Sequence, residues 1–176
     1  SSQWAGQAHN GSWLAKDGGL TLTGDGVSDV QVFNLGNLGN IGNLSLKNVK
    51  AGAHIVINSS ASQVSFSGFL GGDKVNSTDA LAQHRDRLVF NLSNATQVSV
   101  NSFLNGSVLA VNAAVSGTGH LEGTLIAQSL GLTPNGSKLE LGYEPFVPTT
   151  PVPEPQTYAM LLAGLGVIAY VGGRRQ

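Results

Sequence analysis

Short runs of alternating apolar and polar residues recur along the chain from Leu20 onward, separated by Gly, Asn, Ser or Asp. Alternation places successive side chains on opposite faces of a strand, so each run predicts a half-buried β-strand. Residues 77–86 alone carry helix-forming residues, behind a Ser77 or Thr78 cap, and predict a short helix or lid. The expected strands cover residues 20–24, 30–35, 44–49, 54–59, 63–68, 87–93, 96–102, 106–111, 113–117, 121–130 and 138–142.

Strands this short, spaced by about 8–12 residues, fit either a β-sandwich or a β-solenoid. Asparagines that recur beside the strands favour the solenoid, because its corners use left-handed backbone and side-chain ladders. These are Asn34, Asn43, Asn48, Asn58, Asn91, Asn94, Asn101 and Asn112. We therefore expect an all-β fold with a right-handed, β-helix-like solenoid body. Its expected inward residues include Val32, Leu46, Ile55, Ile57, Val89, Val108, Leu125 and Ile126.

The C-terminal region breaks this pattern with an uncharged, apolar run from Tyr158 to Val171. With its flanking residues the run covers 157–173, about 17 residues, which is the lower limit for a membrane-spanning helix. Arg174 and Arg175 follow it, as the positive-inside rule expects of a cytoplasmic end. A buried core helix would usually keep one polar face, which this run lacks. We therefore expect a single C-terminal transmembrane helix and a body outside the cytoplasm.

A Pro-rich linker, residues 145–156, precedes the apolar run and contains Pro153, Glu154 and Pro155. Proline favours extended backbone, so the linker should be extended. A plain membrane anchor would explain the helix and the arginines but not Pro-Glu-Pro. Residues 152–176 resemble the PEP-CTERM sorting signal of Gram-negative bacteria. The resemblance implies processing by an exosortase in a cell that exports exopolysaccharide, with Pro153, Glu154 and Pro155 as the recognition element and Arg174 and Arg175 as stop-transfer charges.

Composition narrows the function classes. Charged residues make up 11% of the chain and its net charge is -1, which leaves no basic stripe for nucleic acid. The chain contains no cysteine, which excludes disulfides, thiol nucleophiles and thiolate metal sites. It starts without Met or a leader, so we expect a mature form or a fragment. Residues 1–19 would then be the remnant of a longer domain, and residues 20–35 would fray or self-associate at an uncovered edge.

Candidate catalytic and metal-binding residues are sparse. His9, His54, His84 and His120 show no metal-ligand spacing, and no GxSxG elbow occurs. Asp86 with Glu122 stays open as a glycosidase pair, although both are expected at the surface. The "GDGVSD" (24–29) and "GGD" (71–73) segments are better explained as turns than as calcium loops. We expect no catalytic residue, no metal and no cofactor, so the chain should not be an enzyme.

The body also carries a resemblance, centred on residues 88–130. Its "VFNLSNATQVSV", "GSVLAVNAAV" and "LEGTLIAQSL" segments resemble the choice-of-anchor A domain, and the pattern extends over about residues 20–146. The last two segments also resemble bacterial ice-binding β-solenoids. We place the β domain at 20–144, the linker at 145–156 and the helix with its basic tail at 157–176.

Together these features indicate an exported bacterial protein of the cell surface or extracellular matrix, with a structural or adhesive role. The alternatives are a ligand-binding β-solenoid, for polysaccharide or ice, and then a carbohydrate-active enzyme. The expected partners are the exosortase, the inner membrane through residues 157–173 before processing, and exopolysaccharide or a second copy of the chain. The protein would be held transiently in the inner membrane and end at the cell surface.

Overall fold

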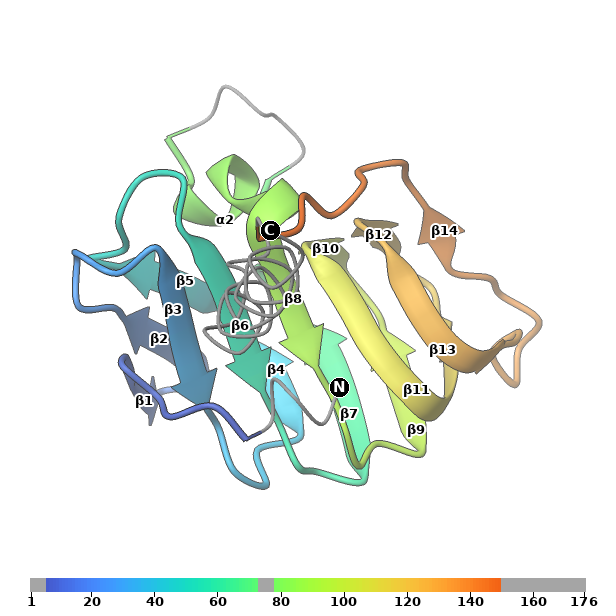
Figure 1. Ribbon diagram of the computed structural model, residues 1–176. Coiled ribbons are helices and arrows are strands. Elements are labelled where there is room, and N and C mark those ends of the chain that lie inside the picture. The colour runs from blue at the N-terminus through green and yellow to red at the C-terminus, as the bar shows by residue number, and fades with distance from the viewer. Residues whose placement is uncertain (1–5, 73–77, 150–176) are drawn as a thin grey trace, which may run out of the picture.

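The computed structural model describes residues 6–72 and 78–149, and this part of the chain is almost entirely β (Figure 1). Its helices are one short α-helix, α2 (Ala80–Gln83), and a 3-10 turn at Arg85–Arg87. The strands are β1 (Ser12–Lys16), β2 (Gly19–Thr23), β3 (Val30–Asn34), β4 (Asn40–Gly42), β5 (Leu44–Lys47), β6 (His54–Asn58), β7 (Gln63–Ser67), β8 (Leu88–Asn91), β9 (Gln97–Val100), β10 (Phe103–Asn105), β11 (Ser107–Gly117), β12 (His120–Glu122), β13 (Leu125–Leu130) and β14 (Glu140–Leu141).

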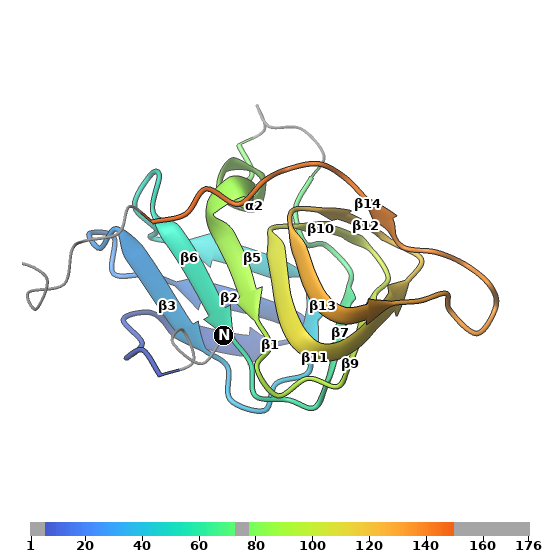
Figure 2. The ribbon, with the colours of Figure 1, turned by 45° about the vertical axis from the view of Figure 1, so that its right-hand side comes forward.

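The strands follow one another around three sides of the body. β2, β3 and β4 make one round, and β5, β6 and β7 repeat it, each pairing in parallel with its counterpart. β8 and β9 extend two of the sides, and the long β11 crosses both, pairing first with β8 and then with β9. The sheet therefore curls round an enclosed interior (Figure 2). The expected all-β class is confirmed.

We name the three sides by their strands. The front side holds β3, β6, β8 and the first halves of β11 and β13. The groove side holds β4, β7, β9 and the second halves of β11 and β13. The back side holds β1, β2 and β5, and then β10, β12 and β14.

The interior is filled by one apolar side chain from every second strand position. Phe66 and Phe90 are fully buried and meet edge to face, with ring centroids 4.9 Å apart. The predicted inward residues Ile55, Ile57 and Val108 lie in this core, and Leu46 and Leu125 pack half-buried against it. A buried phenylalanine or leucine contributes about 1.5–3 kcal/mol by leaving water, so these layers dominate the stability of the body.

Three predicted inward residues point elsewhere. Val32 and Val89 are buried on the outer face of the front side, in a separate cluster with Val56. Ile126 is wrong as a core residue, since it is 52% exposed. Strand alternation explains this, because its neighbour Leu125 takes the inward position and two successive residues cannot share a face.

The asparagines act at the corners as expected. Asn43 and Asn48 have φ angles of 44° and 50°, in the left-handed region. Asn34, Asn58 and Asn91 end β3, β6 and β8 and form a ladder: the Asn58 amide donates to Asn34 Oδ1 and the Asn91 amide donates to Asn58 Oδ1, both at 2.7 Å. Such a ladder fixes the register between successive rounds.

The helix prediction was right in place and wrong in detail. α2 begins after Asp79, whose side chain accepts a hydrogen bond from the Leu81 amide, so the cap is neither Ser77 nor Thr78. Three short strands, β1, β4 and β10, were not predicted. β4 and β10 have three residues each, too few to show alternation in the sequence.

The expected open edge at residues 20–35 is covered. β1 pairs antiparallel with β2 along its whole length. Beside β3, the Asn10 side chain donates to the Val30 carbonyl and accepts from the Val32 amide, as a neighbouring strand would. The expectation of an uncovered edge was therefore wrong, because residues 10–16 supply the missing partners, whereas fraying and self-association of residues 20–35 stay predictions.

Within residues 6–72 and 78–149, no helix is long and apolar enough to cross a membrane. The expected transmembrane helix at 157–173 lies outside the described residues, as do most of the linker and the basic tail. The domain boundaries drawn from the sequence stay predictions.

Candidate functional site

The outer face of the groove side is built by strand alternation. Val64, Phe66, Val98, Val100 and Val115 point into the core. The residues between them point outward, and they are small or neutral polar side chains. The alternation that points apolar side chains into the core therefore also points polar side chains to the outer face.

Parallel register aligns these outward residues in two rows that run across the strands. One row is Asn40, Ser65, Ser99 and Ser116. The other is Gln63, Gln97, Ala114 and Ser129. Neighbouring members of a row are about 4.8 Å apart, the spacing of strands in a sheet.

The two rows line a shallow open hollow of about 680 Å³, which continues to Gly39 at one end and to Leu132 at the other. Ser65 Oγ donates to Asn40 Oδ1 at 2.6 Å, which orders the first rung. At the corner beyond the hollow, Gly117 lets the rounds stack closely, since a Cβ there would lie 1.9 Å from the Val100 carbonyl oxygen.

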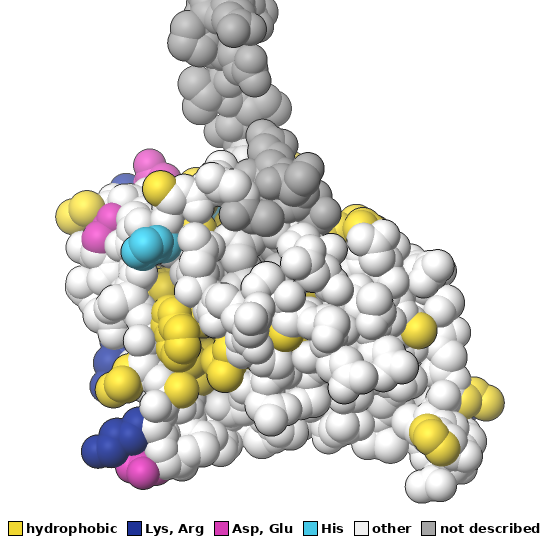
Figure 3. Space-filling view, turned by 90° about the horizontal axis from the view of Figure 1, so that it is seen from below, with side chains coloured by type: hydrophobic (Ala, Val, Ile, Leu, Met, Phe, Trp, Pro, Cys, Tyr) yellow, Lys and Arg dark blue, Asp and Glu magenta, His cyan; other side chains and the backbone are white. Residues whose placement is uncertain are grey.

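Among the described residues, the lining of this hollow includes no charged or aromatic side chain. Seen from below the view of Figure 1, most of the described surface is likewise neutral and polar (Figure 3). Its hydroxyl and amide groups can donate and accept hydrogen bonds to an uncharged polar ligand.

A second polar cluster lies on the back side, around His120. Its ring stacks on Phe103, with centroids 4.8 Å apart, and its nitrogens meet Glu122 at 2.9 Å and Glu140 at 3.1 Å. Partial burial acts to lower the pKa of His120, but hydrogen bonds to Glu122 and Glu140 outweigh it and raise the pKa above its ordinary value of 6.5. Both ring nitrogens are thus engaged by carboxylates, which makes the cluster a structural tie between β10, β12 and β14.

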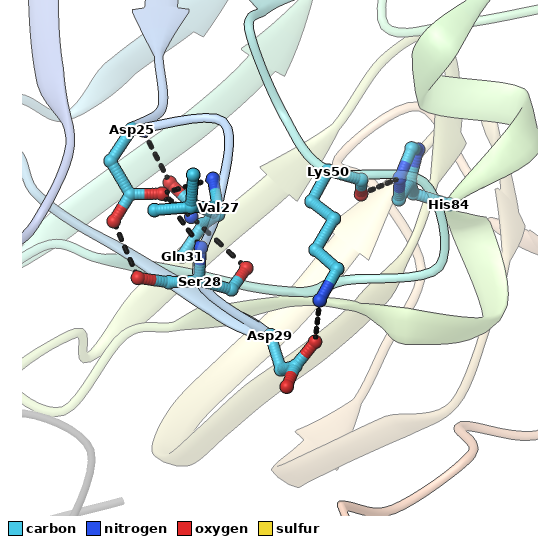
Figure 4. Close-up of polar contacts among 7 residues, drawn as sticks. All are labelled: Asp25, Val27, Ser28, Asp29, Gln31, Lys50 and His84. Carbon is cyan, nitrogen blue, oxygen red and sulfur yellow. Dashed lines mark hydrogen bonds and ion pairs between the residues drawn. The ribbon is translucent and has the colours of Figure 1, made fainter.

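The "GDGVSD" segment is a turn held by Asp25 (Figure 4). Its carboxylate accepts hydrogen bonds from the Ser28 hydroxyl, the Ser28 and Val27 amides and the Gln31 side chain. These hydrogen bonds, named here from the largest contribution to the smallest, hold the pKa of Asp25 well below its ordinary value. The turn prediction is confirmed, because the carboxylate serves the local backbone. Nearby, Lys50 Nζ pairs with Asp29 at 2.6 Å.

After β14, residues 143–149 run as a strap over the outer face of the front side. Glu144 pairs with Arg85 at 2.7 Å, and the Val147 amide donates to the Asp86 carbonyl at 2.7 Å. Phe146 packs on the cluster of Val32, Val56 and Val89. The strap explains why those valines are buried on the outer face.

Four further candidate residues also have ordinary partners. His54 Nε2 donates to the Val147 carbonyl at 2.8 Å, and the buried His84 contacts the Ala80 carbonyl at 2.8 Å. Asp86 pairs with Arg87, while Glu122 pairs with His120. No group of three metal-ligating side chains occurs among residues 6–72 and 78–149.

Pro153, Glu154, Pro155, Arg174 and Arg175 lie outside the described residues. The groove itself was missed by the sequence reasoning. A signal was present: Gln-Val-Ser recurs at 63–65 and 97–99, and these segments become neighbouring strands in exact register.

Comparison with known proteins gives two matches. A family model described as "Putative Ice-binding-like adhesive domain" matches residues 1–140, and one described as the PEP-CTERM protein-sorting motif matches residues 151–176. No curated protein matches the chain, and no solved structure does.

The sorting motif implies processing by an exosortase, and the two matches together indicate an exported cell-surface protein. The resemblance to the PEP-CTERM signal is confirmed, whereas neither match carries the name choice-of-anchor A. Because the first match covers residues 1–140 of 176, the chain belongs to the family of ice-binding-like adhesive domains.

Proposed function

We propose that this chain is a non-catalytic adhesin of the cell surface or extracellular matrix, which holds neutral exopolysaccharide in the hollow of its groove side. The body is a right-handed β-solenoid of the choice-of-anchor A type in this proposal. The observation that carries it is the hollow of about 680 Å³, lined by ordered rows of uncharged hydroxyl and amide groups. A neutral glycan offers the matching hydroxyls at each sugar unit, without a charge to desolvate.

Affinity electrophoresis of the full chain tests the binding, with dextran as a neutral probe and alginate as an acidic one. Gln97→Ala removes a groove amide and should weaken dextran binding about two- to tenfold, the value of one hydrogen bond. Gln128→Ala is the matched control, since Gln128 is equally an exposed strand glutamine but lies outside the hollow. Equal loss in both variants, or binding to alginate alone, would contradict the proposal.

Ice is the second candidate ligand, and the family description favours it. A flat row of hydroxyls is available on the back side, where Thr21 and Ser45 are hydrogen-bonded at 3.1 Å. That row is short, because Lys47 lies opposite Thr23 on the next strand. Thermal hysteresis in the full chain, abolished by Thr21→Lys and retained in Gln97→Ala, would support ice over glycan.

The sorting half of the proposal assigns Pro153, Glu154 and Pro155 to exosortase recognition and Arg174 and Arg175 to stop-transfer, with residues 157–173 held in the inner membrane before processing. In an exosortase-positive host, mass spectrometry should find a mature protein that lacks residues 158–176. Glu154→Ala should leave the tail in place. Recovery of the intact tail from the unsubstituted chain would refute this role.

A further inference from the structure

The two ends of the strand stack are finished differently. At the first round, β1 covers the edge of β2, and Asn10 covers the edge of β3 through backbone and side-chain hydrogen bonds. These partners satisfy donors and acceptors that an edge strand otherwise presents to any passing chain. The first end of the front side therefore leaves few backbone donors and acceptors with which a further strand could pair.

At the other end of the front side, β13 presents a long strand without such a cover. Within the described residues β13 pairs with β11 alone, so one of its edges faces outward. Ile126 and Leu130 are 52% and 49% exposed on this strand, and Leu132 follows at 64%. β13 contains no lysine or proline, the residues that commonly protect a sheet edge.

We propose that β13 pairs antiparallel with β13 of a second copy of this chain, across a two-fold axis, and that the protein is a dimer joined at this edge. The segment from Thr124 to Ser137 contains no charged side chain, so two copies meet without like-charge repulsion. Antiparallel pairing of a strand with itself is self-complementary, as a two-fold interface requires. The front sheet would then continue from one copy into the next.

Because the edge of β3 is already covered, the assembly stops at two copies and does not grow into a filament. A head-to-tail arrangement would place β13 of one copy against β3 of the next, where Asn10 already binds the Val30 and Val32 backbone. Open filaments need that contact, whereas a two-fold dimer does not. The strap also leaves β13 accessible, because its contacts are with Arg85, Thr124, Asp86 and His54, and none of these involves residues 125–130.

Spin labels on the full chain test the geometry, since the chain has no cysteine of its own. A label at Gln128→Cys should report a partner within about 20 Å, because paired strands lie about 5 Å apart with a rise of about 3.4 Å per residue. A label at Val27→Cys, in the turn before β3, should report about 40 Å, because five strand layers in each copy separate the two sites.

Ile126→Lys should raise the dimer dissociation constant at least about tenfold in sedimentation equilibrium, because it sets two charges across the axis. Val27→Lys is the matched control: it replaces a 72% exposed apolar residue at the covered end and should change nothing. The proposal would be overturned if the unsubstituted chain sediments as a monomer at about 100 µM, or as oligomers larger than a dimer. Equal effects of the two lysine substitutions would also overturn it. So would association without the short distance at position 128, which is the result expected of contact through the apolar C-terminal segment.

Discussion

The asparagine ladder gives the sharpest test of how the rounds are held in register. Asn58 is its middle rung, 7% exposed, and it both donates to Asn34 and accepts from Asn91 at 2.7 Å. Asn58→Ala removes both hydrogen bonds, each worth about 0.5–1.5 kcal/mol net. Both Asn58 and Asn91 are buried, so water replaces the lost partners poorly.

We therefore expect Asn58→Ala to lower the free energy of unfolding by about 1–3 kcal/mol, the sum of its two ladder bonds. Asn34→Ala is the matched variant at the end of the ladder. It breaks one ladder bond, and Asn34 is only half-buried, so water can replace the lost partner. Its expected cost is about 0.5–1.5 kcal/mol.

Urea unfolding of the full chain, followed by far-UV circular dichroism, measures both losses. The two variants should keep the same dependence on urea and differ in midpoint. Equal losses for the two substitutions, or a loss below about 1 kcal/mol for Asn58→Ala, would refute the view that the buried rung carries the ladder.

Three further predictions concern the core, the His120 cluster and the strap. Phe66→Ala should lower the free energy of unfolding by about 3–5 kcal/mol in the same urea assay, because Phe66 is fully buried against Phe90. A loss below about 2 kcal/mol would mean that neighbouring side chains refill the cavity. The raised pKa of His120 means that its ion pairs stabilise the fold most below pH 6.5 and that this stabilisation is lost as pH rises through the folded pKa. The difference in free energy of unfolding between the unsubstituted chain and His120→Gln should therefore shrink from pH 6 to pH 8.5. A constant difference would contradict the ion pairing. Phe146→Ala should release the strap and speed hydrogen exchange at the Val147 amide, which donates to Asp86, while exchange in β6 stays slow; unchanged exchange at Val147 would show that Glu144 and His54 hold the strap alone.

The sequence determined the strands and the sorting motif because both signals are local. Alternation with period two marks a strand wherever one face is buried, and it located most of the strands in the described residues. Asn43 and Asn48 marked corners because asparagine tolerates left-handed backbone. Pro153, Glu154 and Pro155 before an uncharged run announced a sorting motif, which the family match at 151–176 confirms.

Only the tertiary structure decided which face of a strand is the inner one and what covers the other. Val32 and Val89 alternate as core residues do, yet they face outward and are buried by Phe146, which is distant in sequence. The groove arises because Gln63 and Gln97 come into register across β7 and β9, a consequence of the length of each round that no single strand encodes. The same long-range pairing covers β2 and β3 through residues 10–16 and leaves β13 at the edge, since coverage depends on which segments return to each end of the stack.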